Sequence, residues 1–166
     1  MNEITRTDAV LDTSEKYFTE VLEPEVQSYL ELPSSFRSAF NVARSLFHYH
    51  EWLYADRRAD LERRYGRSFA KKGDFWGEVE AAHNAHAFIR DFANASKHVR
   101  LTIKPSTSMT HIANTSFTVL KSGNDNVDMN VFGGSLKMKD GNYDVSFDYC
   151  ATQLFRYWKE LRTNLS

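Results

Sequence analysis

The hydrophobic period changes near residue 100, and this change constrains the fold of the chain more than any other feature of its sequence. Before it, apolar residues recur at spacings of three and four, which is typical of amphipathic α-helices. After it, apolar and polar residues alternate, which is typical of half-buried β-strands. The pattern predicts an α+β fold with an N-terminal bundle of about four helices (1–100), an antiparallel β-meander (101–149) and a C-terminal helix (150–166).

The chain has 166 residues, of which 42% are hydrophobic and 14% aromatic. This length fits one domain, and this composition supplies a core that needs no metal or disulfide to hold it together. The sequence contains no internal repeat and no low-complexity linker. We therefore expect residues 1–166 to form a single domain.

Proline, serine and glycine residues mark the expected helix ends in the first hundred residues. Pro33-Ser34-Ser35 predicts the start of a long helix with a serine as its N-cap, and this helix is expected to extend to about Arg64 with Gly66 as its stop. A further helix is expected from about 75–78 to 98–99. In the second part, Asp140-Gly141-Asn142 predicts a hairpin between two alternating segments.

Charge and cysteine content limit the partners and the compartment. Lys and Arg number 21 against 22 Asp and Glu, so no global field attracts nucleic acid or an anionic membrane. Cys150 is the only cysteine, which leaves no intrachain disulfide. No apolar run approaches the ~20 residues that a membrane-spanning helix needs, and the start of the chain does not resemble a signal peptide. We expect a cytoplasmic protein that does not enter a membrane.

The helix expected to end near residue 98 carries most of the reactive side chains. At about 100° per residue, its apolar residues fall on one side of the helix. Histidine, arginine, asparagine and aspartate on the other side are residue types used for proton transfer and anion recognition. A solvated polar face, or a structural latch at the end of the helix, explains the same pattern without chemistry. The polar side consists of Glu80, His83, His86, Arg90, Asp91, Asn94, Lys97 and His98.

A metal site on this helix is a weaker alternative. Glu80-x-x-His83 has the i,i+3 spacing of carboxylate-bridged di-iron bundles, which need a second such pair. His48-x-x-Glu51 reverses the order, and no cysteine supports His83 and His86. We therefore predict neither a metal nor a cofactor.

Two further groups of polar residues lie upstream. Arg37, Arg44, His48 and Glu51 share one face of the long helix, and antiparallel packing would bring Arg44 and His48 opposite Arg90. A dense basic segment follows, with interleaved aromatics that suit phosphate and base contacts, although a solvated helix end is the commoner explanation of such a segment. Its cations are Arg57, Arg58, Arg63, Arg64, Arg67, Lys71 and Lys72.

Two motifs together carry a resemblance to known proteins. His48-Tyr49-His50-Glu51-Trp52 followed by Arg90-Asp91-Phe92-Ala93-Asn94-Ala95-Ser96-Lys97-His98 resembles an uncharacterised family of bacterial and phage-associated proteins. The arrangement is remotely similar to HEPN domains, helical bundles that include metal-independent ribonucleases. The resemblance covers under a fifth of the chain.

The resemblance implies an RNA-acting protein, either an endoribonuclease or an inactive relative with a role as a toxin or in defence. His98 would be the acid–base group, Arg90 would hold the phosphate, and Asp91 and Asn94 would orient them. The partners implied are RNA and either a second copy or another protein. The alternative is a non-enzymatic interaction protein in which the Asp-Asn-Lys-His helix is a structural latch. The residues expected to bind are Lys97, Arg44, His48 and Trp52.

Overall fold

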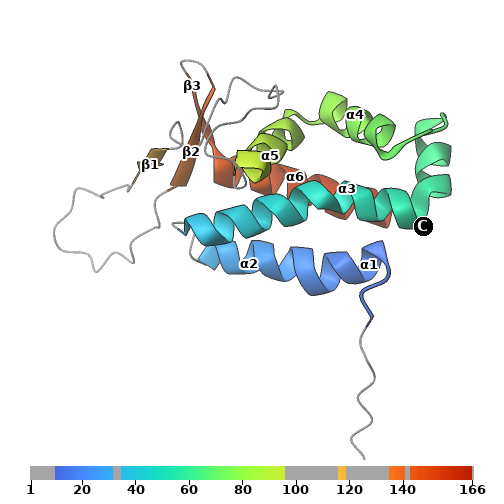
Figure 1. Cartoon of the computed structure of the whole chain (residues 1–166), viewed down its shortest axis with the longest axis horizontal. Coiled ribbons are helices and arrows are strands. Elements are labelled where there is room, and N and C mark those ends of the chain that lie inside the picture. The colour runs from blue at the N-terminus through green and yellow to red at the C-terminus, as the bar shows by residue number, and fades with distance from the viewer. Residues whose placement is uncertain (1–9, 32–34, 96–115, 119–134, 141–142, 166) are drawn as a thin grey trace, which may run out of the picture.

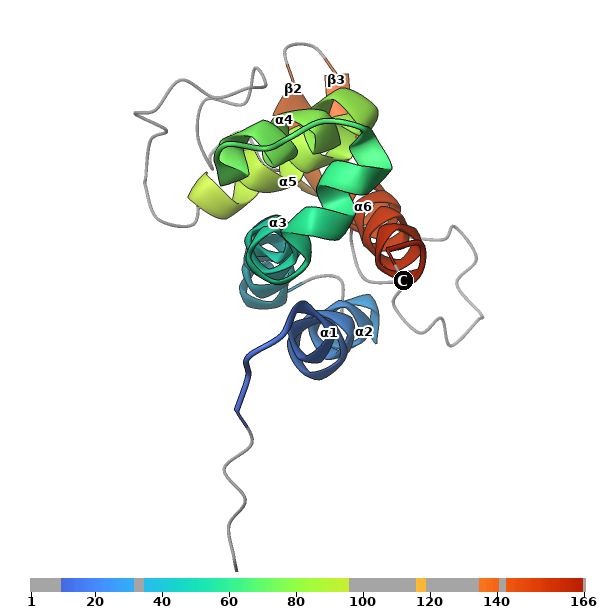
Figure 2. The same cartoon turned by 90° about the vertical axis from the view of Figure 1, so that its right-hand side faces the viewer.

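The computed structural model describes residues 10–31, 35–95, 116–118, 135–140 and 143–165. Its helices surround a long central one, α3, which contacts each of the others (Figures 1 and 2). No helix in the described ranges combines the length and the apolar character needed to cross a membrane. The helical elements are α1 (Ser14–Tyr17), a π-helical turn (Phe18–Leu22), α2 (Glu23–Glu31), α3 (Phe36–Tyr65), α4 (Lys72–Ala82), α5 (Asn84–Ala95) and α6 (Phe147–Thr163).

The long helix α3 begins and ends where its sequence predicts. The Ser35 side chain accepts a hydrogen bond from the Ser38 N–H at 3.3 Å, which satisfies a free donor at the helix start. Gly66 follows the last turn with φ 64°, and its N–H binds the Glu62 carbonyl. The predicted N-cap and stop are therefore confirmed. The helix bends at Arg57 (φ −124°, ψ 27°), and its last turns point toward α4 (Figure 1).

Gly66 and Gly77 give a matched pair of substitutions. Gly66→Ala is expected to destabilise the protein by about 1–2 kcal/mol, because a Cβ disfavours the left-handed conformation that ends α3. Gly77→Ala, inside α4 and with open space around the added Cβ, is expected to stabilise it by about 0.5–1 kcal/mol. Urea unfolding of both variants measures the two effects. A change in the free energy of unfolding with the same sign in both variants would contradict this account.

Helices α1 and α2 are joined by the π-helical turn into one continuous helical segment. Its N-terminus is capped twice. The Thr13 side chain accepts a hydrogen bond from the Lys16 N–H at 3.2 Å, and Asp56 of α3 accepts one from the Ser14 N–H at 3.0 Å. Because the second cap comes from another helix, a tertiary contact helps to decide where this segment begins.

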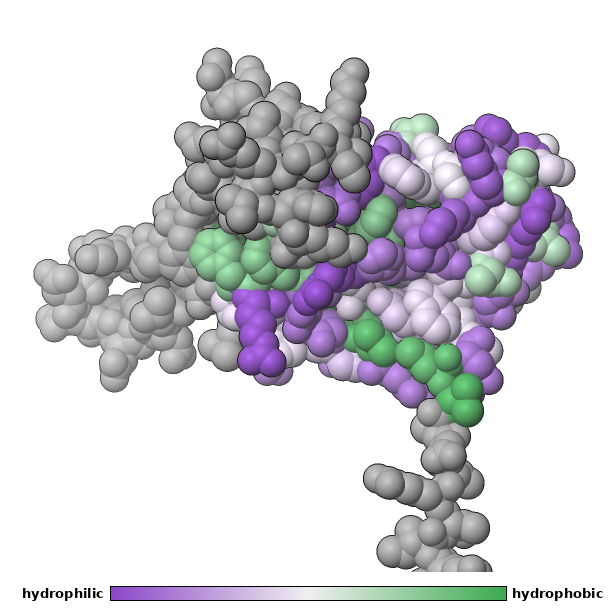
Figure 3. Space-filling model, viewed as in Figure 1, coloured by the Kyte–Doolittle hydropathy of each residue, from purple (hydrophilic) through white to green (hydrophobic). Residues whose placement is uncertain are grey.

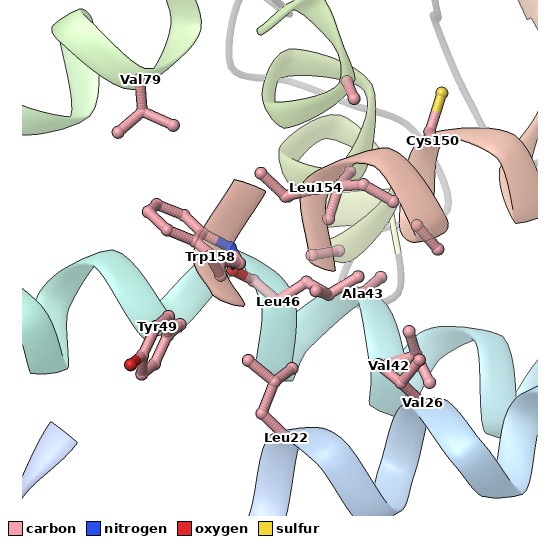
Figure 4. Close-up of a cluster of buried hydrophobic side chains, with 14 of the residues drawn as sticks. Leu22, Val26, Val42, Ala43, Leu46, Tyr49, Val79, Cys150, Leu154 and Trp158 are labelled. Carbon is pink, nitrogen blue, oxygen red and sulfur yellow. Dashed lines mark hydrogen bonds between the residues drawn. The ribbon is translucent and has the colours of Figure 1, made fainter. Parts of the chain in front are cut away.

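The core lies where α3 meets α6 and α2 (Figure 4). Trp158 and Leu154 of α6 are fully buried, and so are Leu46 and Tyr49 of α3. The Trp158 indole N–H donates a hydrogen bond to the Leu46 carbonyl at 3.0 Å, so its polar atom is satisfied inside the apolar interior. Cys150 lies in the same core, where burial raises the pKa of its thiol to about 12.

The predicted fold class is wrong. The described chain is mostly helical, and its β structure consists of β1 (Ser116–Thr118), β2 (Ser135–Asp140) and β3 (Tyr143–Ser146). These short strands pair antiparallel in the order β1-β2-β3, and β2 and β3 form a small hairpin against α6. The remainder of the expected meander over 101–149 lies outside the described residues.

One reason for the error lies in the segment after Asp140. Tyr143, Val145, Phe147 and Tyr149 alternate with polar residues and predict a strand, yet β3 ends at Ser146 and a helix follows. Ser146 caps this helix by accepting a hydrogen bond from the Tyr149 N–H at 3.3 Å. Phe147 fits the strand pattern and also the helical stripe of α6, and the cap together with burial of the stripe favours the helix.

Candidate functional site

A single residue divides the helix that carries most of the predicted site. His83 is extended (φ −142°, ψ 105°), its N–H closes α4 on the Val79 carbonyl at 2.8 Å, and its own carbonyl accepts from the His86 N–H at 3.0 Å as α5 begins. The single helix expected from 75–78 to 98–99 is therefore wrong. A helical wheel assumes one axis, so the predicted continuous polar face from Glu80 to His98 does not exist.

Three polar residues of α5 lie inside the protein. His86 is fully buried, Asp91 is 2% exposed and Arg90 is 8% exposed. Helix α5 packs against α3, α4 and α6, so its polar side is covered as well as its apolar side. The interpretation of these residues as a solvated face is therefore wrong, and the cost of their burial demands partners.

Arg90 has such partners. Its Nη1 donates to Glu80 Oε1 of α4 at 2.6 Å, while Nε and Nη2 each lie 3.3 Å from Asp91 Oδ1. The guanidinium also lies over the ring of Trp76 in α4, 4.9 Å from its centroid. We call Trp76, Glu80, His86, Arg90 and Asp91 the Arg90 cluster. The cluster joins α4 to α5 through a charge that both carboxylates neutralise.

A second buried histidine, His50, lies beside His86 of this cluster. His86 Nδ1 is 3.4 Å from Glu80 Oε1, and the His86 ring is 5.6 Å from that of His50 and 6.1 Å from that of Trp158. The His50 Nδ1 contacts the Phe47 carbonyl. Burial lowers the pKa of His50 to about 4 and also lowers the pKa of His86. Both rings are therefore neutral at pH 7 and enclosed among aromatic side chains.

Glu80 keeps its charge in this setting. Burial by itself would raise the pKa of the Glu80 carboxyl, but its contacts with His86, Trp76 and Arg90 together lower it. The carboxylate is therefore ionised at neutral pH and remains the anionic partner of Arg90.

The residues predicted on α3 do not join the cluster. Arg44 is exposed and binds its own helix, at the Phe40 carbonyl (3.3 Å) and the Asn41 Oδ1 (2.6 Å). His48 Nδ1 pairs with Glu51 of the same helix at 3.6 Å. The Trp52 ring stacks on Tyr17 of α1, with 4.8 Å between centroids.

The end of the predicted site is described only in part. Asn94 is half-buried near the end of α5, and Lys97 and His98 lie outside the described residues. The roles assigned to these three residues stay predictions.

The basic segment near the end of α3 is largely neutralised. Five of its seven cations form ion pairs with carboxylates: Arg57 and Arg63 with Asp60, Arg58 with Glu62, Arg67 with Glu78, and Lys72 with Glu51. Hydrophilic residues cover much of the described face in Figure 3, with apolar areas at its left and at its lower right edge. Paired charges give a weak field, so this segment supplies little attraction for a phosphate backbone.

The upstream residues do not form a metal site in the described part of the chain. No three His, Cys, Asp or Glu side chains there are placed to hold one ion. His83 packs on Tyr157, with 4.4 Å between ring centroids, whereas His86 points into the core. The break in the helix at His83 therefore separates the surroundings of the two histidines that were considered as metal ligands.

Comparisons of the chain with family models, with curated proteins and with solved structures find no match. The arrangement of the Arg90 cluster therefore carries the functional argument. Sequence reasoning missed Trp76 and placed His86 on the surface. No local pattern in the sequence pointed to the pair of Glu80 with Arg90, because the two residues are ten apart and ion pairs along one straight helix join residues three or four apart.

Proposed function

We propose that this chain is a non-enzymatic interaction protein and that the Arg90 cluster is a structural latch between α4 and α5. One observation carries the proposal. The Arg90 guanidinium is only 8% exposed, and it is held by the carboxylates of Glu80 and Asp91. An arginine in this position joins two helices and is not presented to a ligand.

A ribonuclease would require the opposite arrangement. Its arginine must reach a phosphate, and its histidine must exchange protons with the ribose or the leaving oxygen. A phosphate approaching Arg90 would have to displace Glu80 and would meet the negative charge of Asp91. The neighbouring His86 is fully buried, which removes it from proton exchange with a substrate.

The test is RNA integrity after expression of the wild type and of His98→Ala. The latch proposal predicts that neither protein fragments cellular RNA and that the two RNA profiles are identical. Purified wild type incubated with total RNA in the presence of EDTA is the matched measurement in vitro. Fragmentation by the wild type that is lost in His98→Ala would overturn the proposal.

The latch also predicts a stability effect. Glu80→Gln is expected to lower the free energy of unfolding by about 2 kcal/mol and the melting temperature by about 4–8 °C, because Arg90 loses one of its two carboxylate partners in a largely buried position. The matched control is Glu78→Gln on the same helix, whose ion pair with Arg67 is solvent-exposed and contributes less than about 1 kcal/mol. Equal melting temperatures for the two variants would contradict the latch.

A further inference from the structure

Helix α4 is attached to the protein by few buried side chains. Only Phe75 and Val79 of its eleven residues are buried, whereas eight of the twelve residues of α5 are. Figures 1 and 2 both place α4 at the outer edge of the molecule, on the side of α3 opposite to α1 and α2. Helices with few buried contacts are the first to open in a folded protein.

Extended residues flank α4 on both sides. Lys71 (φ −143°, ψ 160°) precedes it and His83 (φ −142°, ψ 105°) follows it. The chain before Lys71 is anchored, because Phe69 is fully buried and its carbonyl accepts a hydrogen bond from the Tyr54 hydroxyl at 3.2 Å. Single extended residues at both ends of a helix can absorb the change in φ and ψ that a rigid rotation requires.

The surface beneath α4 consists of aromatic rings and histidines. Trp76 lies 6.1 Å from the ring of Phe47 and 6.1 Å from that of His50, and Phe75 lies 6.5 Å from Trp158. The His86 Nε2 atom is buried there and has no hydrogen-bond partner among the described residues. An unsatisfied buried nitrogen costs free energy in the closed arrangement, and that cost is recovered when the ring meets water.

We propose that α4 is a hinged cover that opens as a unit about Lys71 and His83 and exposes this histidine and aromatic surface. The ion pair between Glu80 and Arg90 is the clasp that holds the cover closed, so the inference rests on the latch role proposed above. Lys72 forms a second, more exposed contact with Glu51 of α3. Opening breaks these contacts and leaves the packing of α2, α3 and α6 intact.

Hydrogen exchange measured by mass spectrometry on the full chain tests the cover. In the wild type, the amides of α4 are expected to exchange at least about tenfold faster than the slowest amides of α3 and α6. Glu80→Gln is expected to accelerate exchange in α4 by about a further thirtyfold, because the ion pair that holds the helix closed is lost. Uniform protection of α4, α3 and α6 in the wild type would overturn the proposal, and so would unchanged exchange of α4 in Glu80→Gln.

A second variant separates local opening from global unfolding. Val26→Ala removes buried methyl groups from α2, on the far side of α3, and is expected to accelerate the slowest amides of α3 and α6 by about tenfold. Exchange in α4 should stay at the wild-type rate, because local opening leaves the packing of Val26 intact. Acceleration of amide exchange in α4 by the same factor would show that α4 exchanges only through global unfolding.

The exchange experiment and the RNA experiment fail separately. RNA fragmentation would count against the proposed function and would leave these exchange rates unaffected, so the two failures are distinguishable.

Discussion

Replacement of Trp158 by alanine is expected to lower the free energy of unfolding by about 4 kcal/mol, the largest effect of any substitution discussed. The side chain is fully buried, and its rings lie 5.5 Å from Tyr49 and 5.0 Å from Tyr157. The substitution leaves a large cavity between α3 and α6 (Figure 4) and removes the donor that binds the Leu46 carbonyl. Both losses act on the contact that holds the two longest helices together.

The measurement is urea unfolding followed by circular dichroism, supported by the melting temperature, which should fall by about 8–16 °C. Trp52→Ala is the control, because Trp52 is only half-buried and stacks on Tyr17 at the edge of the bundle. We expect Trp52→Ala to lower the free energy of unfolding by well under half as much as Trp158→Ala. A cost for Trp158→Ala no larger than for Trp52→Ala would contradict the central position of Trp158.

Acidification from pH 7 to pH 5 is expected to destabilise the protein, with His50 contributing about 2 kcal/mol to the loss. Burial lowers the pKa of His50 from 6.5 to about 4 in the folded chain, whereas the unfolded chain keeps the ordinary value. The unfolded chain therefore binds the proton first as pH falls. The contribution of His50 to stability is fully present above about pH 6.5, and it declines as pH falls until the folded state also takes up the proton near pH 4.

His86 acts in the same direction, because burial lowers the pKa of its ring as well. Glu80 adds to the loss only at lower pH, since its folded pKa is lowered from an ordinary value of 4.5. The slope between pH 7 and pH 5 therefore reports chiefly on the two buried histidines.

His50→Phe tests this assignment by replacing a ring that titrates with an apolar ring of similar size. The variant should lose about 2 kcal/mol of the pH dependence measured by urea unfolding at pH 7 and pH 5. His48→Phe is the matched control two residues earlier, where the side chain is 36% exposed; this variant keeps His50 and should therefore keep the loss of stability that His50 causes. An unchanged slope in His50→Phe would rule out His50 as a source of acid sensitivity.

Local signals in the sequence predicted the long helix α3 well. Ser35 and Gly66 determine its ends through hydrogen bonds that reach only a few residues along the chain, to the Ser38 N–H and the Glu62 carbonyl. Local hydrogen bonds of this kind depend on neighbouring residues alone, so they can be read from the sequence. The apolar stripe around Leu154 and Trp158 likewise predicted the buried side of α6.

Alternation predicted too much β structure. At Phe147 the strand pattern overlaps the helical stripe of α6, and the choice between them depends on the Ser146 cap and on what the helix buries. Neighbouring residues favour both outcomes there, so packing against the rest of the protein decides between them.

The sequence by itself determined the helical character of the described part of the first hundred residues, the ends of α3 and the identity of the polar residues on the fourth predicted helix. Only the tertiary structure decided what those polar residues do. The break at His83 changes the direction of the chain between α4 and α5, and this brings Glu80 to Arg90 across ten residues. A buried charge needs a partner in space, and the sequence pattern of one helix does not specify which neighbouring helix supplies it.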